Sequence, residues 1–358
     1  MEKRIEKVRS IMRSENLEAL LICTSHNIAY LTGFKGFSTH EREGYLLLTL
    51  SDSYILTDPR LSEGARQHSI GTKVIELNAT QKLVPSLSEI VARENIKSIG
   101  FEEHLTYYEY KKFNTIKGAK LKLVSELIET VREIKDEDEL KHIKAACELT
   151  DKTYSHIIKN IKLNMSEQDA AWEMEKYIRE NKGTLAFPTI VAFGKNSAIP
   201  HHHTGDTKLE HNSIILLDFG AQINGYCADM TRTVFFGQPL EKFKKMYETV
   251  KVAQEKGFIN TSKPFSGQDI DSASRDYIKA QGYPTIPHSV GHGIGLQVHE
   301  LPHISIGFNT EIIPNTPFTI EPGIYENGFG GVRIEDTVYF DGSKILPLTQ
   351  SPKILTEI

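Results

Sequence analysis

The amino-acid sequence predicts an α+β protein with two domains. The chain has 358 residues, and because a domain commonly spans about 100–200 residues, this length favours two domains. Helix-like and strand-like segments alternate before position 133, which is typical of an α/β unit with a mixed sheet. Residues 137–235 and 240–348 each run two helix-like stretches and then strands, which hints at an internal repeat.

The elements of the first domain follow from the periodicity of its apolar residues. Residues 2–15 are charged with a sparse apolar stripe, which predicts a surface helix. Residues 17–23 are a short apolar run and predict a buried strand. Two further runs flank Ser51 and Asp52 and predict a hairpin. The hairpin strands and the helix and strand expected after them lie at residues 45–50, 53–57, 84–93 and 98–101.

The chain changes character at residues 133–139, where charged residues are dense. We interpret this run as a boundary followed at once by a helix, since apolar residues recur at helical spacing from Leu140 to Ile157. The domains are therefore expected at residues 1–132 and 133–358.

Three more helices are predicted in the second domain. One begins at Ser166, because Ser166 and Asp169 have the spacing of a capping box. The other two lie near residues 241–256 and 268–281, and each is followed by a glycine.

Composition and charge exclude several classes of protein. The chain carries 42 Lys and Arg against 47 Asp and Glu, a formal net charge of −5, which disfavours nucleic acid as a partner and gives no reason to expect an anionic membrane. The first residues lack the apolar core of a signal peptide, and no apolar run is long enough for a membrane span. Cys23, Cys147 and Cys227 form no disulfide or zinc pattern. We expect a soluble cytoplasmic protein.

Two acids are predicted to share one face of a hairpin. Asp218 ends an apolar strand, and Asn224-Gly225 is a strong hairpin signal that precedes Asp229. If those two residues form the loop, Asp218 faces Thr231, and Asp218 and Asp229 are diagonal neighbours, about 7–8 Å apart by backbone. Two negatively charged carboxylates on one buried face repel each other unless a positive charge compensates them. Either a metal ion provides it, or each acid pairs with a nearby basic residue such as Arg232.

Further ligand types follow along the chain. Glu321 ends another apolar stretch, Glu335 lies in a β-like segment, and residues 288–295 contain His292 among three glycines. The two histidines of this segment are four apart, but Ser289 stands where a helical zinc motif needs glutamate. We therefore predict a glycine-rich loop that presents His292.

Four carboxylates and one imidazole would make an oxygen-rich site. Such ligands suit Mn(II), and less specifically Co(II), Fe(II) or Zn(II). Four negative charges balance two divalent cations, and two metal ions about 3.5–4 Å apart support hydrolytic chemistry.

In these segments the sequence resembles the pita-bread metallopeptidases, specifically aminopeptidase P and prolidase. The resemblance covers nearly the whole chain, and residues 27–34 resemble the creatinase-like N-terminal domain of the family. It implies a pita-bread catalytic domain after a smaller creatinase-like α/β domain. The segments that carry it in the second domain are Asp218-Phe219-Gly220, Asp229-Met230-Thr231-Arg232-Thr233, Gly291-His292-Gly293-Ile294-Gly295, Val298-His299-Glu300, Glu321-Pro322-Gly323 and Arg333-Ile334-Glu335-Asp336.

The resemblance implies roles for the metal ligands. Asp218 would chelate one metal ion, and Asp229 and Glu335 would bridge two. His292 and Glu321 would bind the other ion, and Glu321 would also serve as general base.

The resemblance also implies roles in substrate binding. His299 would stabilise the scissile carbonyl, His201 would position the substrate, and His288 would line a pocket for proline. Tyr325 and Arg333 would contact the substrate or support the site, although Tyr325 packing in the core and Arg333 pairing with a carboxylate are open alternatives.

Some neighbouring residues are expected to take no part in catalysis or binding. Two others depart from the family pattern. His202 and His203 are expected to be exposed bystanders. Phe193 stands where many relatives carry a small residue, and Gln297 where an acid is frequent. These two residues put the shape and charge of the substrate pocket in doubt, and neither is a metal position.

The function that the resemblance implies is metal-dependent cleavage of the bond between a first residue and proline. Our main expectation is an aminopeptidase P that acts on proline-containing peptides, and the alternative is a prolidase restricted to dipeptides. A non-catalytic binding protein on the same fold is a remote alternative, because such relatives typically lose metal ligands. The resemblance also implies a homodimer.

Overall fold

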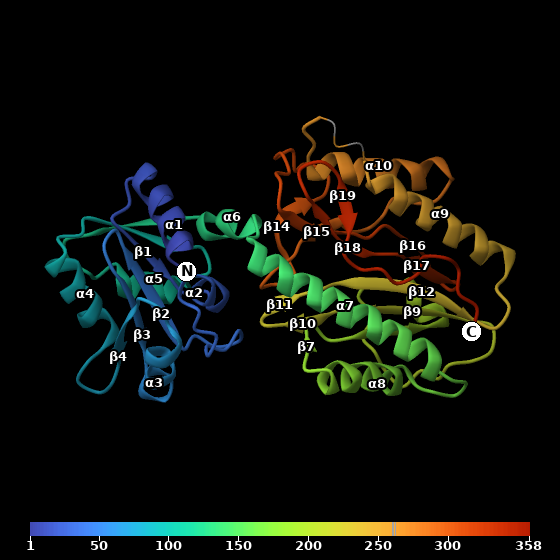
Figure 1. Ribbon diagram of the computed structural model, residues 1–358, viewed down its shortest axis with the longest axis horizontal. Coiled ribbons are helices and arrows are strands. Elements are labelled where there is room, and N and C mark those ends of the chain that lie inside the picture. Colours follow the sequence, from blue (N-terminus) through green and yellow to red (C-terminus); the bar gives the residue numbers. More distant parts are fainter. Residues whose placement is uncertain (260, 262) are drawn as a thin grey trace. The chain divides into compact units, whose positions relative to one another are not determined.

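The computed structural model describes residues 1–259, 261 and 263–358 (Figure 1). The chain divides into two compact units, Met1–Arg132 and Glu133–Ile358. Among the described residues, no helix is long and apolar enough to cross a membrane.

The first unit contains a mixed sheet, as the sequence predicts. The sheet has six strands, and the two at residues 73–76 and 120–124 were not predicted. The central strand β1 runs parallel to β5 and antiparallel to β2, and the strand order is β4-β3-β2-β1-β5-β6. All of β1 is buried, since apolar side chains cover both faces of a central strand. The strands are β1 (Ala19–Ile22), β2 (Gly44–Thr49), β3 (Ser53–Thr57), β4 (Lys73–Glu76), β5 (Ser98–Glu102) and β6 (Lys120–Val124).

The helices of this unit include the two that periodicity predicts and several that it misses. Three of the missed helices have seven or eight residues, too few turns to display an apolar stripe. The fourth, α3, carries local signals that the prediction did not use, because Asp58 caps its N-terminus and Pro59 occupies its first turn. The helices are α1 (Glu2–Ser14), α2 (Ser25–Thr32), α3 (Pro59–His68), α4 (Leu83–Arg93), α5 (Tyr107–Phe113) and α6 (Leu127–Glu133).

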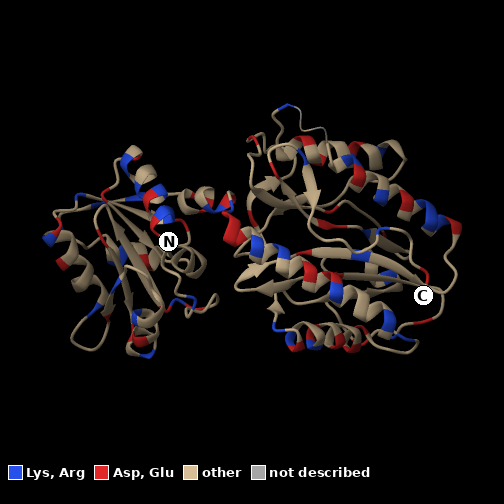
Figure 2. Ribbon diagram, in the orientation of Figure 1, with Lys and Arg blue, Asp and Glu red and all other residues tan. Residues whose placement is uncertain are grey.

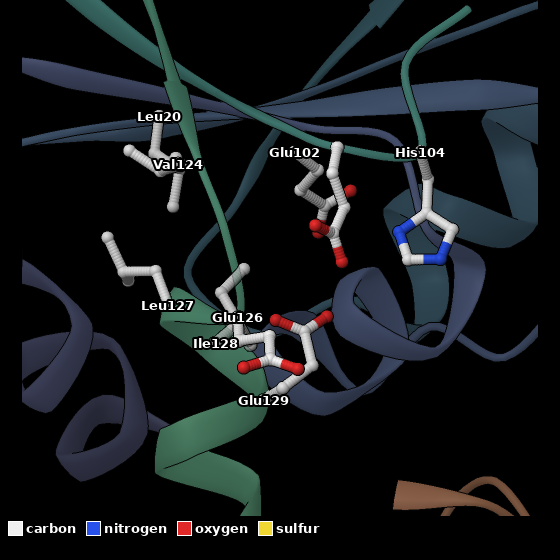
Figure 3. Close-up of a pocket in the computed structure, with 9 residues that line it drawn as sticks. Leu20, Glu102, His104, Val124, Glu126, Leu127, Ile128 and Glu129 are labelled. Carbon is white, nitrogen blue, oxygen red and sulfur yellow. The ribbon is translucent and has the colours of Figure 1, made fainter. Parts of the chain in front are cut away.

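Asn27, on α2, links three segments of the first unit. Its amide nitrogen donates to Glu102 and to Glu129 at 2.6 Å each, and its amide oxygen accepts from Arg132. Both glutamates line a cavity of about 10 Å³ (Figure 3), which has room for about one water molecule. This network ties α2 to the end of β5 and to α6, and we interpret it as structural.

The second unit places strands between two pairs of helices (Figure 1). Helices α7 (Glu137–Asn160) and α8 (Glu167–Glu180) lie on one side, and α9 (Glu241–Gly257) and α10 (Gly267–Ala280) on the other. All four were predicted. Asp136 forms a capping box before α7. Residues of both charge signs are interspersed along these helices (Figure 2).

Within the described residues of the second unit, the strands form four sheets. Their orders are β12-β9-β8, β11-β10-β7, β14-β13-β15-β18-β19 and β16-β17. A 3₁₀ helix, η1, follows β8 at Gly194–Ala198. The strands are β7 (Thr184–Leu185), β8 (Ile190–Phe193), β9 (Ser213–Phe219), β10 (Ala221–Ile223), β11 (Tyr226–Cys227), β12 (Met230–Phe236), β13 (Gly291–Gly293), β14 (Glu300–Ile304), β15 (Thr316–Ile320), β16 (Gly323–Glu326), β17 (Gly330–Arg333), β18 (Asp336–Phe340) and β19 (Ile345–Pro347).

Candidate metal centre

The hairpin that carries Asp218 has the predicted register. Asn224 and Gly225 have φ angles of 51° and 84°, as a tight two-residue turn of this kind requires. On β9 and β12, Asp218 faces Thr231. Asp229 lies directly before β12, and its backbone N–H donates to Thr337 on β18. The hairpin therefore holds both acids beside the larger sheet.

His292 lies in a strand, so the predicted glycine-rich loop is wrong at this position. It occupies the middle of β13, which pairs with β14 and β15. A Cβ on Gly291 or Gly293 would come within 2.0 Å of a carbonyl oxygen of a neighbouring strand, Thr319 or Leu301. The glycines are there because the strands approach too closely for a side chain. The expected absence of a helix is confirmed.

Glu321 and Glu335 both lie where strands end. Glu321 follows β15, and its backbone N–H donates to Val290 at 2.7 Å. Glu335 lies between β17 and β18, and its backbone N–H donates to Thr231 at 3.1 Å. These backbone hydrogen bonds attach the two segments to neighbouring parts of the second unit. They thereby fix the positions of the two carboxylates.

Three predicted ligands converge tightly and a fourth lies beside them. One ligand atom from each of Asp229, His292 and Glu335 lies within 4.8 Å of the others. The Nε2 atom of His292 is 3.5 Å from Glu321 Oε1 and 3.6 Å from Asp229 Oδ2. Its Nδ1 is 3.1 Å from the carbonyl of Gly293. When Nδ1–H donates there, the lone pair of Nε2 faces the carboxylates.

The charges of this cluster are poorly compensated by the protein itself. Burial and the charges of Glu335, Asp218 and Glu321 raise the pKa of Asp229 well above its usual range. Burial and the charges of Glu321 and Asp218 also raise the pKa of Glu335 well above its usual range. Burial raises the pKa of Glu321 to about 8 and lowers that of His292 to about 3, so the imidazole is neutral.

The residues present fit a divalent cation. Asp229 Oδ1 is buried and has no hydrogen-bond partner among residues 1–259, 261 and 263–358. A buried carboxylate oxygen without a donor is costly, and a bound cation would satisfy it. Carboxylates with one neutral imidazole are a donor set that divalent metals accept.

Asp218 stands apart from the tight cluster because a basic residue holds it. Its carboxylate accepts a short hydrogen bond from Arg333 Nη2. Arg232 instead pairs with Asp336 at 2.6 Å, so Arg232, named as a candidate partner in the alternative to a metal ion, does not compensate Asp218. Arg333 also donates to Thr231 and to the hydroxyl of Tyr325, each at 3.0 Å. Pairing of Arg333 with a carboxylate, one of the open alternatives, is confirmed.

The predicted histidines surround this arrangement. His288 Nε2 is 2.8 Å from the hydroxyl of Tyr325, so Tyr325 does more than pack. The rings of His299 and His292 lie 4.3 Å apart, edge to face. His201 is exposed and lies near enough to His288 and His299 that its charge lowers both pKa values, in addition to the larger effect of burial.

One residue near the site was missed by the sequence analysis. Glu167 is fully buried, and each of its oxygens accepts two hydrogen bonds at 2.8–3.0 Å. The donors are the backbone N–H groups of Phe193 and Gly205 and the side chains of Asn196 and His202. His202 is therefore a structural residue and no exposed bystander. In the sequence, an acid in the first turn of a helix looks like an ordinary capping residue. The buried, hydrogen-bonded role of Glu167 was therefore not predicted.

The two residues that depart from the family pattern have structural contacts. Phe193 is buried in the core of the second unit, beside Ile215 and Leu217. Gln297 is half-buried, and its backbone N–H donates to Glu300 at 2.8 Å.

Comparison with known proteins yields two family models and close structural neighbours. The chain matches metallopeptidase family M24 over residues 141–341 and the creatinase/prolidase N-terminal domain over residues 4–134. A Xaa-Pro dipeptidase of Pyrococcus horikoshii is 34% identical over 98% of both chains. The Xaa-Pro dipeptidase structure from Bacillus anthracis has a TM-score of 0.93 at 33% identity, covering 100% of this chain and 99% of that one.

An X-Pro aminopeptidase structure from Thermotoga maritima is also similar, with a TM-score of 0.90 at 30% identity and 99% coverage of both chains. The predicted fold, a pita-bread catalytic domain with a creatinase-like N-terminal domain, is confirmed. The chain belongs to metallopeptidase family M24.

Proposed function

We propose that this metallopeptidase hydrolyses Xaa-Pro dipeptides, as a prolidase does. The observation that carries the proposal is the buried cluster of Asp229, His292 and Glu335 in a chain that aligns end to end with Xaa-Pro dipeptidases. These relatives favour the dipeptidase alternative over our main expectation of aminopeptidase P. The proposal therefore replaces that expectation.

The metal set in this proposal is two divalent ions, with Mn(II) the preferred metal. The ions would be held by Asp218, Asp229, His292, Glu321 and Glu335. Support comes from the buried negative charge and from the unpaired Oδ1 of Asp229. Bound in this way, the metal ions would supply an activated water molecule and polarise the scissile carbonyl.

The remaining roles belong to side chains around the cluster. Glu321 would accept the proton of the attacking water, and its place beside His292, with Oε1 3.5 Å from Nε2, supports this role. His299 would donate to the carbonyl oxygen of the substrate from its place beside His292. His201 and His288 would hold the substrate, with Tyr325 and Arg333 orienting His288.

Aminopeptidase P activity is the second candidate, supported by the similarity to the Thermotoga maritima aminopeptidase. The test compares an Xaa-Pro dipeptide with an Xaa-Pro-Xaa tripeptide. Protein stripped with chelator is assayed bare and after refilling with Mn(II), and its metal content is measured. We expect cleavage of the dipeptide only, and only with metal.

Each other outcome has a meaning. Cleavage of both peptides would favour aminopeptidase P, and cleavage of neither with metal bound would overturn the Xaa-Pro assignment and favour a binding role. Asp229→Asn should abolish cleavage, whereas Asp206→Asn, a change to an exposed acid, should leave it intact.

Two further parts of the proposal concern the whole molecule. A homodimer would have twice the chain mass of 40.4 kDa, which light scattering would show. A reducing compartment is supported by the three cysteines, which are buried and form no disulfide within the described part of the chain.

A further inference from the structure

We propose that Asp271 and Arg275, on α10, are positioning residues that hold His288 at the substrate site. The inference rests on the proposed function, which gives His288 a place in substrate binding. Asp271 is fully buried. Arg275 forms a bidentate pair with it, with Nε 2.6 Å and Nη2 2.8 Å from the two carboxylate oxygens.

The pair reaches the segment that carries His288. Arg275 also donates to the hydroxyl of Thr285 at 3.1 Å and to the carbonyl oxygens of Ile286 and His288, the latter at 2.8 Å. An arginine has five N–H donors, and these contacts use all of them. Asp271 completes the arrangement, because its Oδ2 accepts the backbone N–H of Val290 at 3.2 Å.

Little else in the backbone holds this segment. Residues 284–289 connect α10 to β13, and within the described part of the chain none of them forms a backbone–backbone hydrogen bond. Pro284, Thr285, Pro287 and Ser289 are exposed. The side chains of Asp271 and Arg275 therefore replace the strand pairing that fixes His292 a few residues later.

The imidazole of His288 depends on this support. Its Nδ1 is 2.6 Å from the carbonyl of Ser289, and its Nε2 is 2.8 Å from the hydroxyl of Tyr325. Arg333 donates to that same hydroxyl. The ring therefore has a fixed direction only if the backbone behind it is fixed, and a shift of about 1 Å is enough to impair a substrate-positioning group.

The test uses Arg275→Lys in the metal-loaded full-length protein. Lysine keeps a charge beside Asp271 but has no planar fork to reach two carbonyl groups as well. We expect the KM for an Xaa-Pro dipeptide to rise about tenfold, with kcat nearly unchanged, because a loss of uniform substrate binding acts on KM. Metal content should stay at the wild-type value, and amide hydrogen exchange should accelerate at Val290, whose N–H donates to Asp271.

Two further variants guard against misfolding and general destabilisation. Thr285→Val leaves the buried ion pair intact and should raise KM in the same direction by a smaller factor. Arg179→Lys makes the same substitution at an exposed position of α8 and should change nothing.

The outcomes separate this inference from the proposed function. If wild-type protein fails to cleave Xaa-Pro dipeptides, the proposed function fails, and the exchange measurement alone decides the role of the pair. A wild-type exchange rate of the Val290 amide in Arg275→Lys would overturn the inference. Equal losses of kcat, metal content and thermal stability would also overturn it, because they would show a merely structural role.

Discussion

Arg333 forms an ion pair with Asp218, although the two residues lie 115 positions apart in the chain. The same guanidinium contacts Thr231, which hydrogen-bonds Glu335 at 2.6 Å, and Tyr325, which contacts His288. One buried arginine thus connects the acidic cluster to a histidine that we assign to substrate binding.

Replacing Arg333 should impair catalysis more than metal binding. We expect Arg333→Gln to lower kcat/KM by about 10–100-fold, the range found when a group that orients ligands is removed. Manganese content should be retained, since Arg333 donates to the carboxylate of Asp218 and is no ligand. Steady-state kinetics and metal analysis of the same preparation check this, with Arg179→Gln on α8 as an exposed control. Loss of metal along with activity would contradict the expectation.

The chelator-stripped protein should become less stable as the pH rises. Burial raises the pKa of Glu321 from 4.5 to about 8 in the folded state. The folded state therefore holds this proton at pH values where the unfolded chain has released it. The stability is fully present below about pH 4.5 and is lost as the pH rises through about 8.

The measurement is the thermal midpoint at several pH values across that window, with chelator and with Mn(II). Metal should raise the midpoint most at the alkaline end, because it binds the deprotonated carboxylates of the folded state. A stripped protein that gains stability steadily from pH 5 to pH 8 would show that the cluster does not behave in this way.

Asp229→Asn should make the stripped protein more stable and the enzyme inactive. Neutralising this carboxylate removes repulsion from Glu335 and Asp218 in the stripped protein, which should stabilise the folded state. The thermal midpoint should then rise, by about 2–4 °C for each kcal/mol gained. Activity should disappear.

Calorimetry of stripped wild-type, Asp229→Asn and Asp206→Asn proteins makes the comparison, with Asp206 as the exposed acid. A lower midpoint for Asp229→Asn alone would mean that Asp229 is compensated by contacts other than metal.

Glu167→Gln should destabilise the second unit. Four donors surround the two oxygens of Glu167, and an amide would turn its own N–H₂ group toward two of them. Two unsatisfied buried donors cost about 2–6 kcal/mol in the free energy of unfolding. Urea denaturation measures the loss, and Glu180→Gln, at the exposed end of α8, serves as the control. A midpoint equal to that of the control would refute the importance of this buried carboxylate.

Much of the local structure could be predicted from the sequence, because its causes lie within a few residues. The Asn224-Gly225 turn determines which residues of β9 and β12 face each other, so the pairing of Asp218 with Thr231 follows by counting. Asp136 and Ser166 cap their helices through side chains that reach three residues ahead. Such signals are complete within one element.

The ion pairs and the loop anchors were decided by tertiary structure alone. Nothing near Asp218 in the sequence distinguishes Arg232 from Arg333, and only the packing of β17 beside β9 and β12 brings Arg333 to it. His292 lies in a strand because Gly291 and Gly293 admit neighbouring backbones, which a glycine-rich sequence does not reveal. Glu167 finds its donors across loops, and so does Arg275 for its contacts with residues 285–288. The sequence by itself determined the long helices, the hairpin and the ligand types. Tertiary packing chose their partners, because long-range contacts depend on how whole elements meet.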